Sequence, residues 1–197
     1  REKRENLRSI RKPGILSVDL AHIRNQDFVN LFPDDGHGYM GPPGSKGYQQ
    51  DRYFLNAVDL LTGYLLTEVL QGKKPAEVAP KLKAILERFE RVSNVKVRQV
   101  EIDKGGEFMG KTSRMFRKAT KAEEKKGEKD GPFAHVRLLQ MTQNATVEQT
   151  NAKMQRIFWN LVAQRRGGFM ETARLAVKIS NRTQNRRTGL NPEQAMK

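Results

Sequence analysis

Residues 144–166, NATVEQTNAKMQRIFWNLVAQRR, predict a long helix from about Thr146 to Arg166. The predicted helix contains no Gly or Pro, and the Gly167-Gly168 pair that follows it is a helix stop signal. Its apolar residues recur at three- and four-residue spacings and form one stripe: Val147, Met154, Phe158, Leu161 and Val162. We therefore expect this helix to pack along the core, with the rest of the chain arranged around it.

Polar side chains share one face of the same helix. Glu148 lies in the first turn, and Asn151 and Gln155 lie one and two turns further along. The helix dipole alone commonly explains an acidic residue in a first turn. A further role for Glu148 therefore depends on the other acidic residues of the chain.

The composition favours a single domain with a polyanionic partner. The chain has 197 residues, of which 37% are hydrophobic, and no apolar run is long enough to cross a bilayer. Lysine and arginine number 37 against 22 acidic residues, so the formal net charge is +15. Such a charge indicates nucleic acid, either DNA or RNA, as the partner, or a basic component of a larger ribonucleoprotein.

The absence of cysteine excludes disulfides and cysteine-based zinc sites. The histidines, His22, His37 and His135, are scattered, which argues against a histidine-rich metal site. The chain does not begin with Met, which predicts a fragment or a processed product.

The order of the predicted elements indicates an α/β fold. Strands are expected at Ile15–Leu20, Tyr53–Val58, Tyr64–Leu70, Val95–Ile102 and His135–Leu139. Helices are expected at Lys73–Arg91, Thr146–Arg166 and Phe169–Asn181, with a last stub opened by Asn191-Pro192, and Thr112–Glu128 is expected to be a helix that frays into a solvated loop. The second and third strands form an antiparallel hairpin closed by the turn residues DLLTG. Strands alternating with helices in this order predict a sheet of mixed direction.

We expect residues 1–12 to be a basic lead-in that can touch phosphates and residues 13–197 to be one domain. Long loops are expected near residues 24–52 and 121–132 because Gly, Pro, Asn, Asp or Lys dominate there. Loops of this length in a compact domain are commonly functional.

Acidic residues occur where strands and the long helix can bring them together. Asp19 lies inside an apolar strand, Asp103 ends another strand, and Glu148 starts the helix. A buried carboxylate is costly unless it is paired or bound to a metal. If the two strands are neighbours, the acids form a cluster that repels itself without cations. Oxygen ligands select Mg²⁺ or Mn²⁺, and two such ions can clamp the attacking and leaving oxygens of a phosphodiester.

Several motifs resemble the catalytic core of retroviral and retrotransposon integrases, within the DDE transposase and ribonuclease-H-like superfamily. ILSVDL resembles the first-aspartate strand of that family, EIDKGGEF its second-aspartate motif, and VEQTN its glutamate-helix motif. YFLNAVDLLTGYLLTEVL resembles its second and third strands, and NRTQNRRTGLNPEQAM its C-terminal signature. The motifs occur in the order of the family and span nearly the whole chain.

The resemblance implies a ribonuclease-H-like mixed sheet flanked by helices. It implies that Asp19, Asp103 and Glu148 are catalytic and bind Mg²⁺ or Mn²⁺ as a pair of ions. Predicted nucleic-acid contacts are Lys104, Asn151, Lys153 and Arg156. Glu107 is expected to support the ligands, and Asp59 to hold a turn rather than a metal. An integrase would also form a homo-oligomer.

The sequence departs from the family pattern around the glutamate. The family commonly has Gly three residues before it, where this chain has Ala145, and basic residues four and seven after it, where this chain has Ala152 and Gln155. Lys153 and Arg156 lie roughly 140° and 80° around the helix from the glutamate. The segment between the second aspartate and the glutamate is also longer than in retroviral cores, as is the loop near residues 24–52. These changes leave the ligands intact and alter the substrate contacts.

The sequence therefore supports two main functions. The first is a Mg²⁺-dependent DNA strand-transferase, located in the nucleus or in a viral or retroelement particle. The second is a co-opted, non-catalytic integrase-like domain that binds nucleic acid or acts as a scaffold in an organellar or cytoplasmic ribonucleoprotein. A ribonuclease that acts on RNA–DNA hybrids shares the expected fold and ranks third, because the order of the motifs follows integrases.

Overall fold

The computed structural model describes residues 14–24, 51–127, 129–142, 145–164, 168–184 and 189–196. The predicted basic lead-in (residues 1–12) and nearly all of the predicted loop near residues 24–52 lie outside the described residues. The end of the long helix that was predicted at Arg166 also lies outside them.

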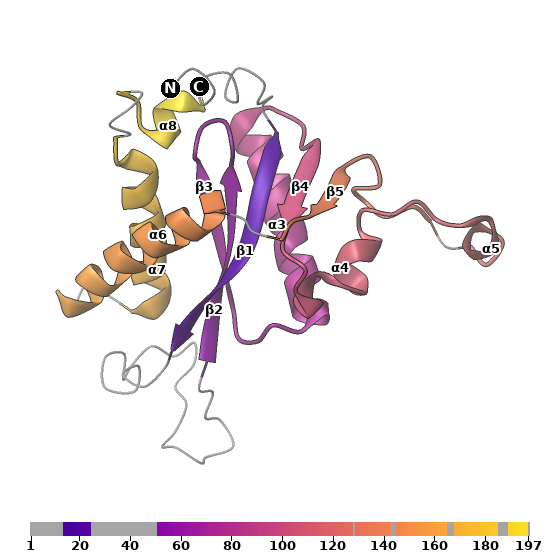
Figure 1. Cartoon of the computed structure of the whole chain (residues 1–197), viewed down its shortest axis with the longest axis horizontal. Helices are drawn as coiled ribbons and strands as arrows, with labels where there is room; N and C mark the ends of the chain where they lie inside the picture. The colour runs from indigo at the N-terminus through magenta and orange to yellow at the C-terminus, as the bar shows by residue number, and fades with distance from the viewer. Residues whose placement is uncertain are drawn as a thin grey trace, which may run out of the picture.

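A five-stranded mixed sheet forms the centre of the protein, in the order β3-β2-β1-β4-β5 (Figure 1). The strands are β1 (Ile15–Arg24), β2 (Asp51–Asp59), β3 (Leu65–Leu70), β4 (Gln99–Ile102) and β5 (Arg137–Gln140). β2 is antiparallel to both of its neighbours, β1 and β3, whereas β4 is parallel to both of its neighbours, β1 and β5. The predicted hairpin and the predicted mixed sheet are both confirmed.

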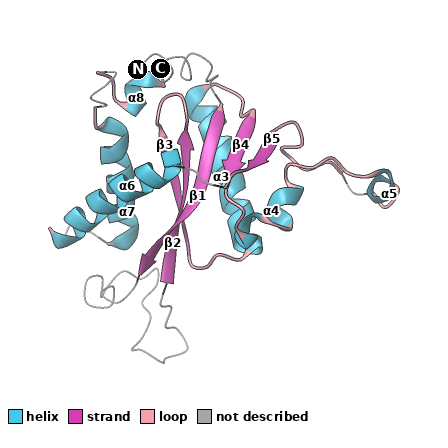
Figure 2. Ribbon diagram, in the orientation of Figure 1, coloured by secondary structure: helices cyan, strands magenta, loops and turns pink. Residues whose placement is uncertain are grey.

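Helices cover both faces of this sheet (Figure 2). They are α3 (Pro75–Ser93), α4 (Lys111–Arg114), α5 (Lys121–Glu124), α6 (Ala145–Ala163), α7 (Phe169–Arg182) and α8 (Pro192–Ala195), with the 3₁₀ turn η1 at Gly106–Phe108. The α3 helix packs on one face, and α6 and α7 pack together on the other. Among the helices that the structure describes, none has the length and apolar character that a membrane span requires.

The long helix has the buried stripe that its sequence predicts. Val147, Met154, Phe158, Leu161 and Val162 are all buried. Phe158 meets Phe54 of β2 and Phe169 of α7 edge-to-face, with ring centroids 5.4 and 5.2 Å apart. Burial of one such side chain contributes about 1.5–3 kcal/mol, so this aromatic cluster fixes α6 against the sheet.

Two predicted elements differ from the structure. The strand predicted at Val95–Ile102 pairs only over Gln99–Ile102, because the Val97 amide donates to the Glu90 carboxylate instead of to a neighbouring strand. The helix predicted at Thr112–Glu128 is broken into α4 and α5. Met115 and Phe116 turn into the core between these two helices, and Thr120 caps the start of the second.

Candidate active site

Strand alternation places Asp19 on the face of the sheet that α6 covers. Leu16 and Val18 lie in the core beside α3, whereas Ala21 and Ile23 lie in the core beside α6. Side chains two residues apart point to the same face, so Asp19 shares the face of Ala21 and Ile23. The Asp19 side chain is only partly buried.

Two donors hold the Asp19 carboxylate. The Leu20 amide donates to Oδ1 at 2.8 Å, and the Asn151 side-chain amide donates to Oδ2 at 2.8 Å. Burial raises the pKa of Asp19 to about 6, against the lowering effect of the Leu20 hydrogen bond, and the charges of Asp103, Glu148 and Glu107 raise it further. The acids that the sequence singles out therefore act on one another electrostatically.

The end of β4 folds tightly and brings two of these acids close together. Asp103 Oδ1 accepts a hydrogen bond of 3.0 Å from the Gly105 amide, which forms a compact turn into η1. A Cβ atom at Gly105 would lie 2.6 Å from a Glu107 carboxylate oxygen. Glycine at this position therefore lets the Glu107 side chain lie over the turn, near Asp103.

Glu148 lies in the first turn of α6, as predicted, and its side chain is exposed. Asn151, one turn further along α6, contacts Asp19, and the charge of Glu148 contributes to the raised pKa of Asp19. Within the described residues, no three acidic or histidine side chains stand close enough together to hold one ion. The cluster therefore has carboxylates with the oxygen chemistry that Mg²⁺ or Mn²⁺ requires, in a more open arrangement than a formed metal site.

The predicted nucleic-acid contacts divide into two groups. Lys104 and Arg156 are exposed. Asn151 is buried and binds Asp19, and the Lys153 ammonium donates to the Ser180 carbonyl of α7 at 3.1 Å. Burial lowers the pKa of Lys153. In this structure Asn151 and Lys153 thus make contacts inside the protein.

A chain of buried and partly buried hydrogen bonds leads from β3 across β2 to Asp19. The Thr67 hydroxyl donates to Asn56 Oδ1 at 2.6 Å, and Asn56 Nδ2 donates to Asn151 Oδ1 at 2.8 Å. Asn151 Nδ2 in turn donates to Asp19 Oδ2. Asn56 is fully buried, so its amide has to find partners within the protein. We call Thr67, Asn56 and Asn151 the amide relay.

Asp59 holds the turn between β2 and β3, as predicted. Its Oδ2 accepts from both the amide and the hydroxyl of Thr62, each at 2.8 Å. The side chain is 1% exposed, and its Oδ1 has no hydrogen-bond donor among the described residues. The role of Asp59 is therefore in folding the hairpin.

Comparison with known proteins identifies the fold. No protein-family model and no curated protein matches the chain. The structure is similar to the integrase catalytic core domain of HTLV-2, solved in complex with magnesium in a trimeric form. The TM-score is 0.60 and the sequence identity 12%, over 93% of this chain and 95% of that chain. The expected ribonuclease-H-like, integrase-core fold is thereby confirmed.

Proposed function

We propose that this chain is the catalytic core of a Mg²⁺-dependent DNA strand-transferase, with Asp19, Asp103 and Glu148 as the metal ligands. The observation that carries the proposal is the position of Asp19 on the α6 face of an integrase-like sheet, where the charges of Asp103 and Glu148 raise its pKa. The acids repel one another, and divalent cations would relieve that repulsion. Magnesium in the HTLV-2 integrase core supports the same choice of ion.

The proposed reaction breaks one phosphodiester, which water would hydrolyse and a DNA 3′-hydroxyl would replace with a new phosphodiester. A water or 3′-hydroxyl oxygen forms a bond to phosphorus, the existing P–O bond breaks, and the leaving oxygen takes up a proton. Bound Mg²⁺ would supply charge neutralisation and activation of the attacking oxygen. The protein contributes the position of the ligands. Asp19 is oriented by Leu20 and Asn151, and Asp103 by the turn at Gly105.

The excess of positive charge supports nucleic acid as the substrate. Lys104 and Arg156 are the exposed predicted contacts that could neutralise phosphates beside the carboxylates. The trimeric form of the HTLV-2 core supports self-association, and an integrase activity would locate the protein in a nucleus or in a viral or retroelement particle.

One observation favours the second function, a non-catalytic scaffold that binds nucleic acid. Within the described residues, no three acids are arranged to hold one ion, and Lys153 is engaged with α7. A co-opted domain could keep such a cluster without using it. The two functions differ in whether divalent metal supports any chemistry.

The test compares the wild-type protein with Glu148→Gln in cleavage and joining of an oligonucleotide duplex with Mg²⁺ or Mn²⁺. We expect metal-dependent products from the wild type and none from the variant, because the amide keeps the shape but loses the charge that holds the metal. DNA binding, measured in parallel, should be largely retained. A full-length protein that binds DNA yet forms no product at any metal concentration would favour the scaffold.

A further inference from the structure

The segment between α4 and β5 forms a protruding arm, residues 117–131, that stands away from the sheet (Figure 1). Its root is paired: the Gly131 amide donates to the Arg117 carbonyl at 3.0 Å, and the Phe133 amide donates to the Met115 carbonyl at 2.9 Å. A Cβ atom at Gly131 would clash with the carbonyl oxygens of Arg114 and Met115, so the two sides of the root approach as closely as glycine allows.

Buried aromatic side chains anchor the root of the arm in the core. Phe116 and Phe133 are both buried, with ring centroids 6.1 Å apart. On the side nearer the carboxylates, the Thr112 hydroxyl of α4 donates to the Glu107 carbonyl of η1 at 3.2 Å. The arm is therefore connected through α4 and η1 to the strand end that carries Asp103.

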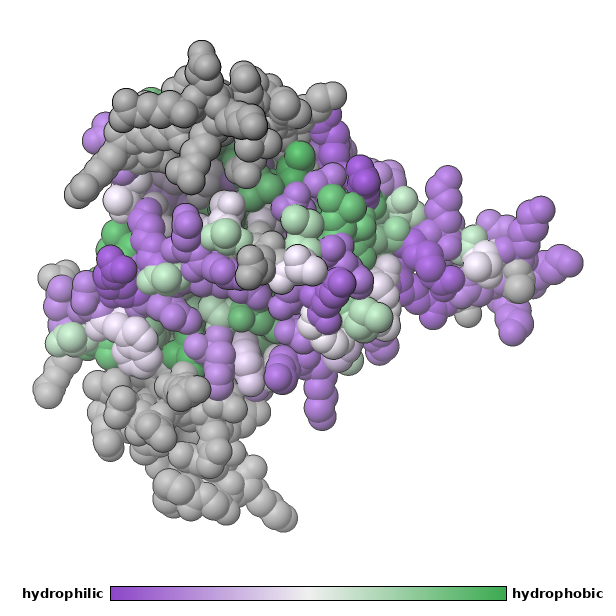
Figure 3. All heavy atoms as spheres, in the orientation of Figure 1, coloured by the Kyte–Doolittle hydropathy of each residue, from purple (hydrophilic) through white to green (hydrophobic). Residues whose placement is uncertain are grey.

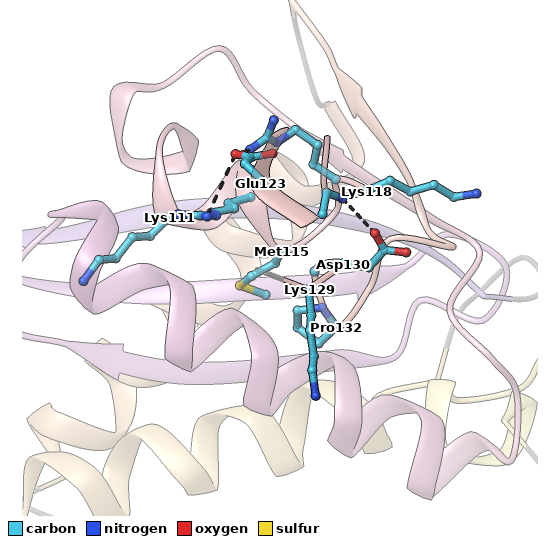
Figure 4. A pocket seen from close by; sticks show the side chains of 11 residues that line it. Lys111, Met115, Lys118, Glu123, Lys129, Asp130 and Pro132 are labelled. Atoms are coloured by element: carbon cyan, nitrogen blue, oxygen red, sulfur yellow. Dashed lines mark hydrogen bonds and ion pairs between the residues drawn. The ribbon is translucent and has the colours of Figure 1, made fainter. Parts of the chain in front are cut away.

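A basic hollow of about 270 Å³ lies between α4 and the arm (Figure 4). Its acidic side chains are engaged internally. Glu123 accepts from the Thr120 amide, the Thr120 hydroxyl and Arg117, and these donors, the amide first, lower its pKa to about 2. Asp130 accepts from the Ala119 amide at 2.7 Å. The acids stabilise the shape of the arm and neutralise few of its cations.

The remaining cations of the hollow are available to an external anion. Lys111, Lys118 and Lys129 form no hydrogen bond or ion pair with any residue that the structure describes. Figure 4 shows their side chains pointing outward in three different directions. They do not converge on one point, which argues against a single small anion and favours charges distributed along a chain.

The surface of the arm has the chemistry of a nucleic-acid contact rather than of a protein interface. Figure 3 shows hydrophilic side chains over the arm. The exposed large apolar side chains of the described residues all lie elsewhere: Leu61, Val92, Met109, Ile179 and Leu190. Protein interfaces commonly have an apolar or aromatic centre, whereas phosphate contacts need only cations and polar groups.

We infer that the arm and its hollow form a second nucleic-acid contact, in which Lys111, Lys118 and Lys129 bind the phosphate backbone of a duplex away from the carboxylates. The inference rests on the proposed function only in taking nucleic acid as the partner, because it requires no chemistry at Asp19, Asp103 or Glu148. The arm would hold one part of the duplex while another part lies at the carboxylate cluster.

The test is binding of a fluorescein-labelled DNA duplex of mixed sequence to the full-length protein, without divalent metal, over a range of salt concentrations. Lys111→Gln/Lys118→Gln/Lys129→Gln should raise Kd about tenfold or more. It should also reduce the slope of log K against log salt by about 2 to 3, since each lost phosphate contact contributes about 0.9 to that slope.

The control variant, Arg91→Gln/Arg174→Gln/Lys178→Gln, removes the same charge from exposed residues of α3 and α7. Its Kd should change less than about threefold, because long-range electrostatics alone is weak at physiological salt. Equal loss in both variants, unchanged binding in the arm variant, or no wild-type binding would overturn the inference. If the arm variant kept its DNA binding but lost self-association, the inference would also be wrong, because the arm would then bind an acidic protein surface instead of DNA. If DNA binding depended on the arm as expected but the protein showed no strand transfer, only the proposed function would be contradicted.

Discussion

Asp19 and Glu123 are both carboxylates held by hydrogen bonds, yet the protein shifts their pKa values in opposite directions. At Asp19, burial and the charges of Asp103, Glu148 and Glu107 outweigh the Leu20 hydrogen bond, and the pKa rises to about 6. At Glu123, donors from Thr120 and Arg117 surround the carboxylate, and the pKa falls to about 2.

The difference separates a carboxylate that stabilises local structure from one that is available for a ligand. In the arm, Glu123 and Asp130 accept hydrogen bonds from nearby donors, so the fold itself satisfies their charge. In the carboxylate cluster, the charges of neighbouring acids raise the pKa of Asp19, and this unfavourable charge is available to an external cation. Functional sites commonly keep such locally unfavourable arrangements.

The largest effect should separate the acids within the cluster. Asp103→Asn should lower the rate of strand transfer by about 10³-fold or more, because loss of a metal ligand removes several kcal/mol of transition-state stabilisation. Glu107→Gln, a neighbouring acid that only supports the ligands, should change the rate less than about tenfold. Equal effects of the two variants in the same assay would mean that Glu107 is itself a ligand.

The amide relay should matter next. Asn56→Leu removes the amide between Thr67 and Asn151 and leaves Asn151 Oδ1 without its donor. We expect Mn²⁺ affinity, measured by calorimetry, to fall about 10- to 100-fold, the usual cost of losing support for a metal ligand. Thr67→Val, which removes only the outer hydroxyl, should have a smaller effect. A loss of stability at unchanged Mn²⁺ affinity would reduce the relay to a purely structural role.

The pKa of Asp19 predicts how the stability of the metal-free protein depends on pH. Because the folded pKa of about 6 exceeds the usual 3.8, the folded state binds a proton more tightly than the unfolded chain. Stability from this group is present below pH about 4 and is lost as pH rises through about 6. Relative to Asp19→Asn, the wild-type protein should therefore lose about 1 kcal/mol of unfolding free energy between pH 4 and 7, after allowance for solvent screening. Urea denaturation at both pH values measures this difference, and a constant difference would contradict it.

The smallest effect is expected in the arm. Glu123 has a lowered pKa, so its contribution is present above its usual pKa and is lost as pH falls toward 2. The side chain acts at the tip of an exposed element. Glu123→Gln should therefore speed amide hydrogen exchange in α5 without a measurable change in global unfolding. Slower or unchanged amide exchange in α5 would show that Glu123 does not stabilise the arm, and would contradict the contrast drawn between Glu123 and Asp19.

Local patterns in the sequence were sufficient to predict the mixed sheet, the hairpin, the stripe of α6 and the turn role of Asp59. The amide relay was not predicted, because it depends on the register that pairs Asp19 with Asn56. That register joins β1 and β2, which are far apart in the sequence, and sequence separation does not fix register. An asparagine inside the apolar run YFLNAV was the one available signal.

The arm illustrates a second limit. Thr120 and Glu123 have the spacing of a capping box, which marks a helix start. The lysine-rich context nevertheless favoured a helix from Thr112 that frays into a solvated loop, without a second helix start. The break is caused by burial of Phe116 against Phe133, a contact between residues on either side of the arm. Tertiary contacts of this kind override local helix propensity.

The central claim, that the carboxylate cluster binds divalent metal, is tested most directly by a crystal structure of the protein soaked with Mn²⁺. We expect an anomalous difference peak in contact with the carboxylates of Asp19 and Asp103, with the exposed Glu148 side chain drawn toward it. The peak should be absent from Asp19→Asn crystals soaked in the same way. Wild-type crystals with no peak among these three carboxylates at saturating Mn²⁺ would contradict the claim.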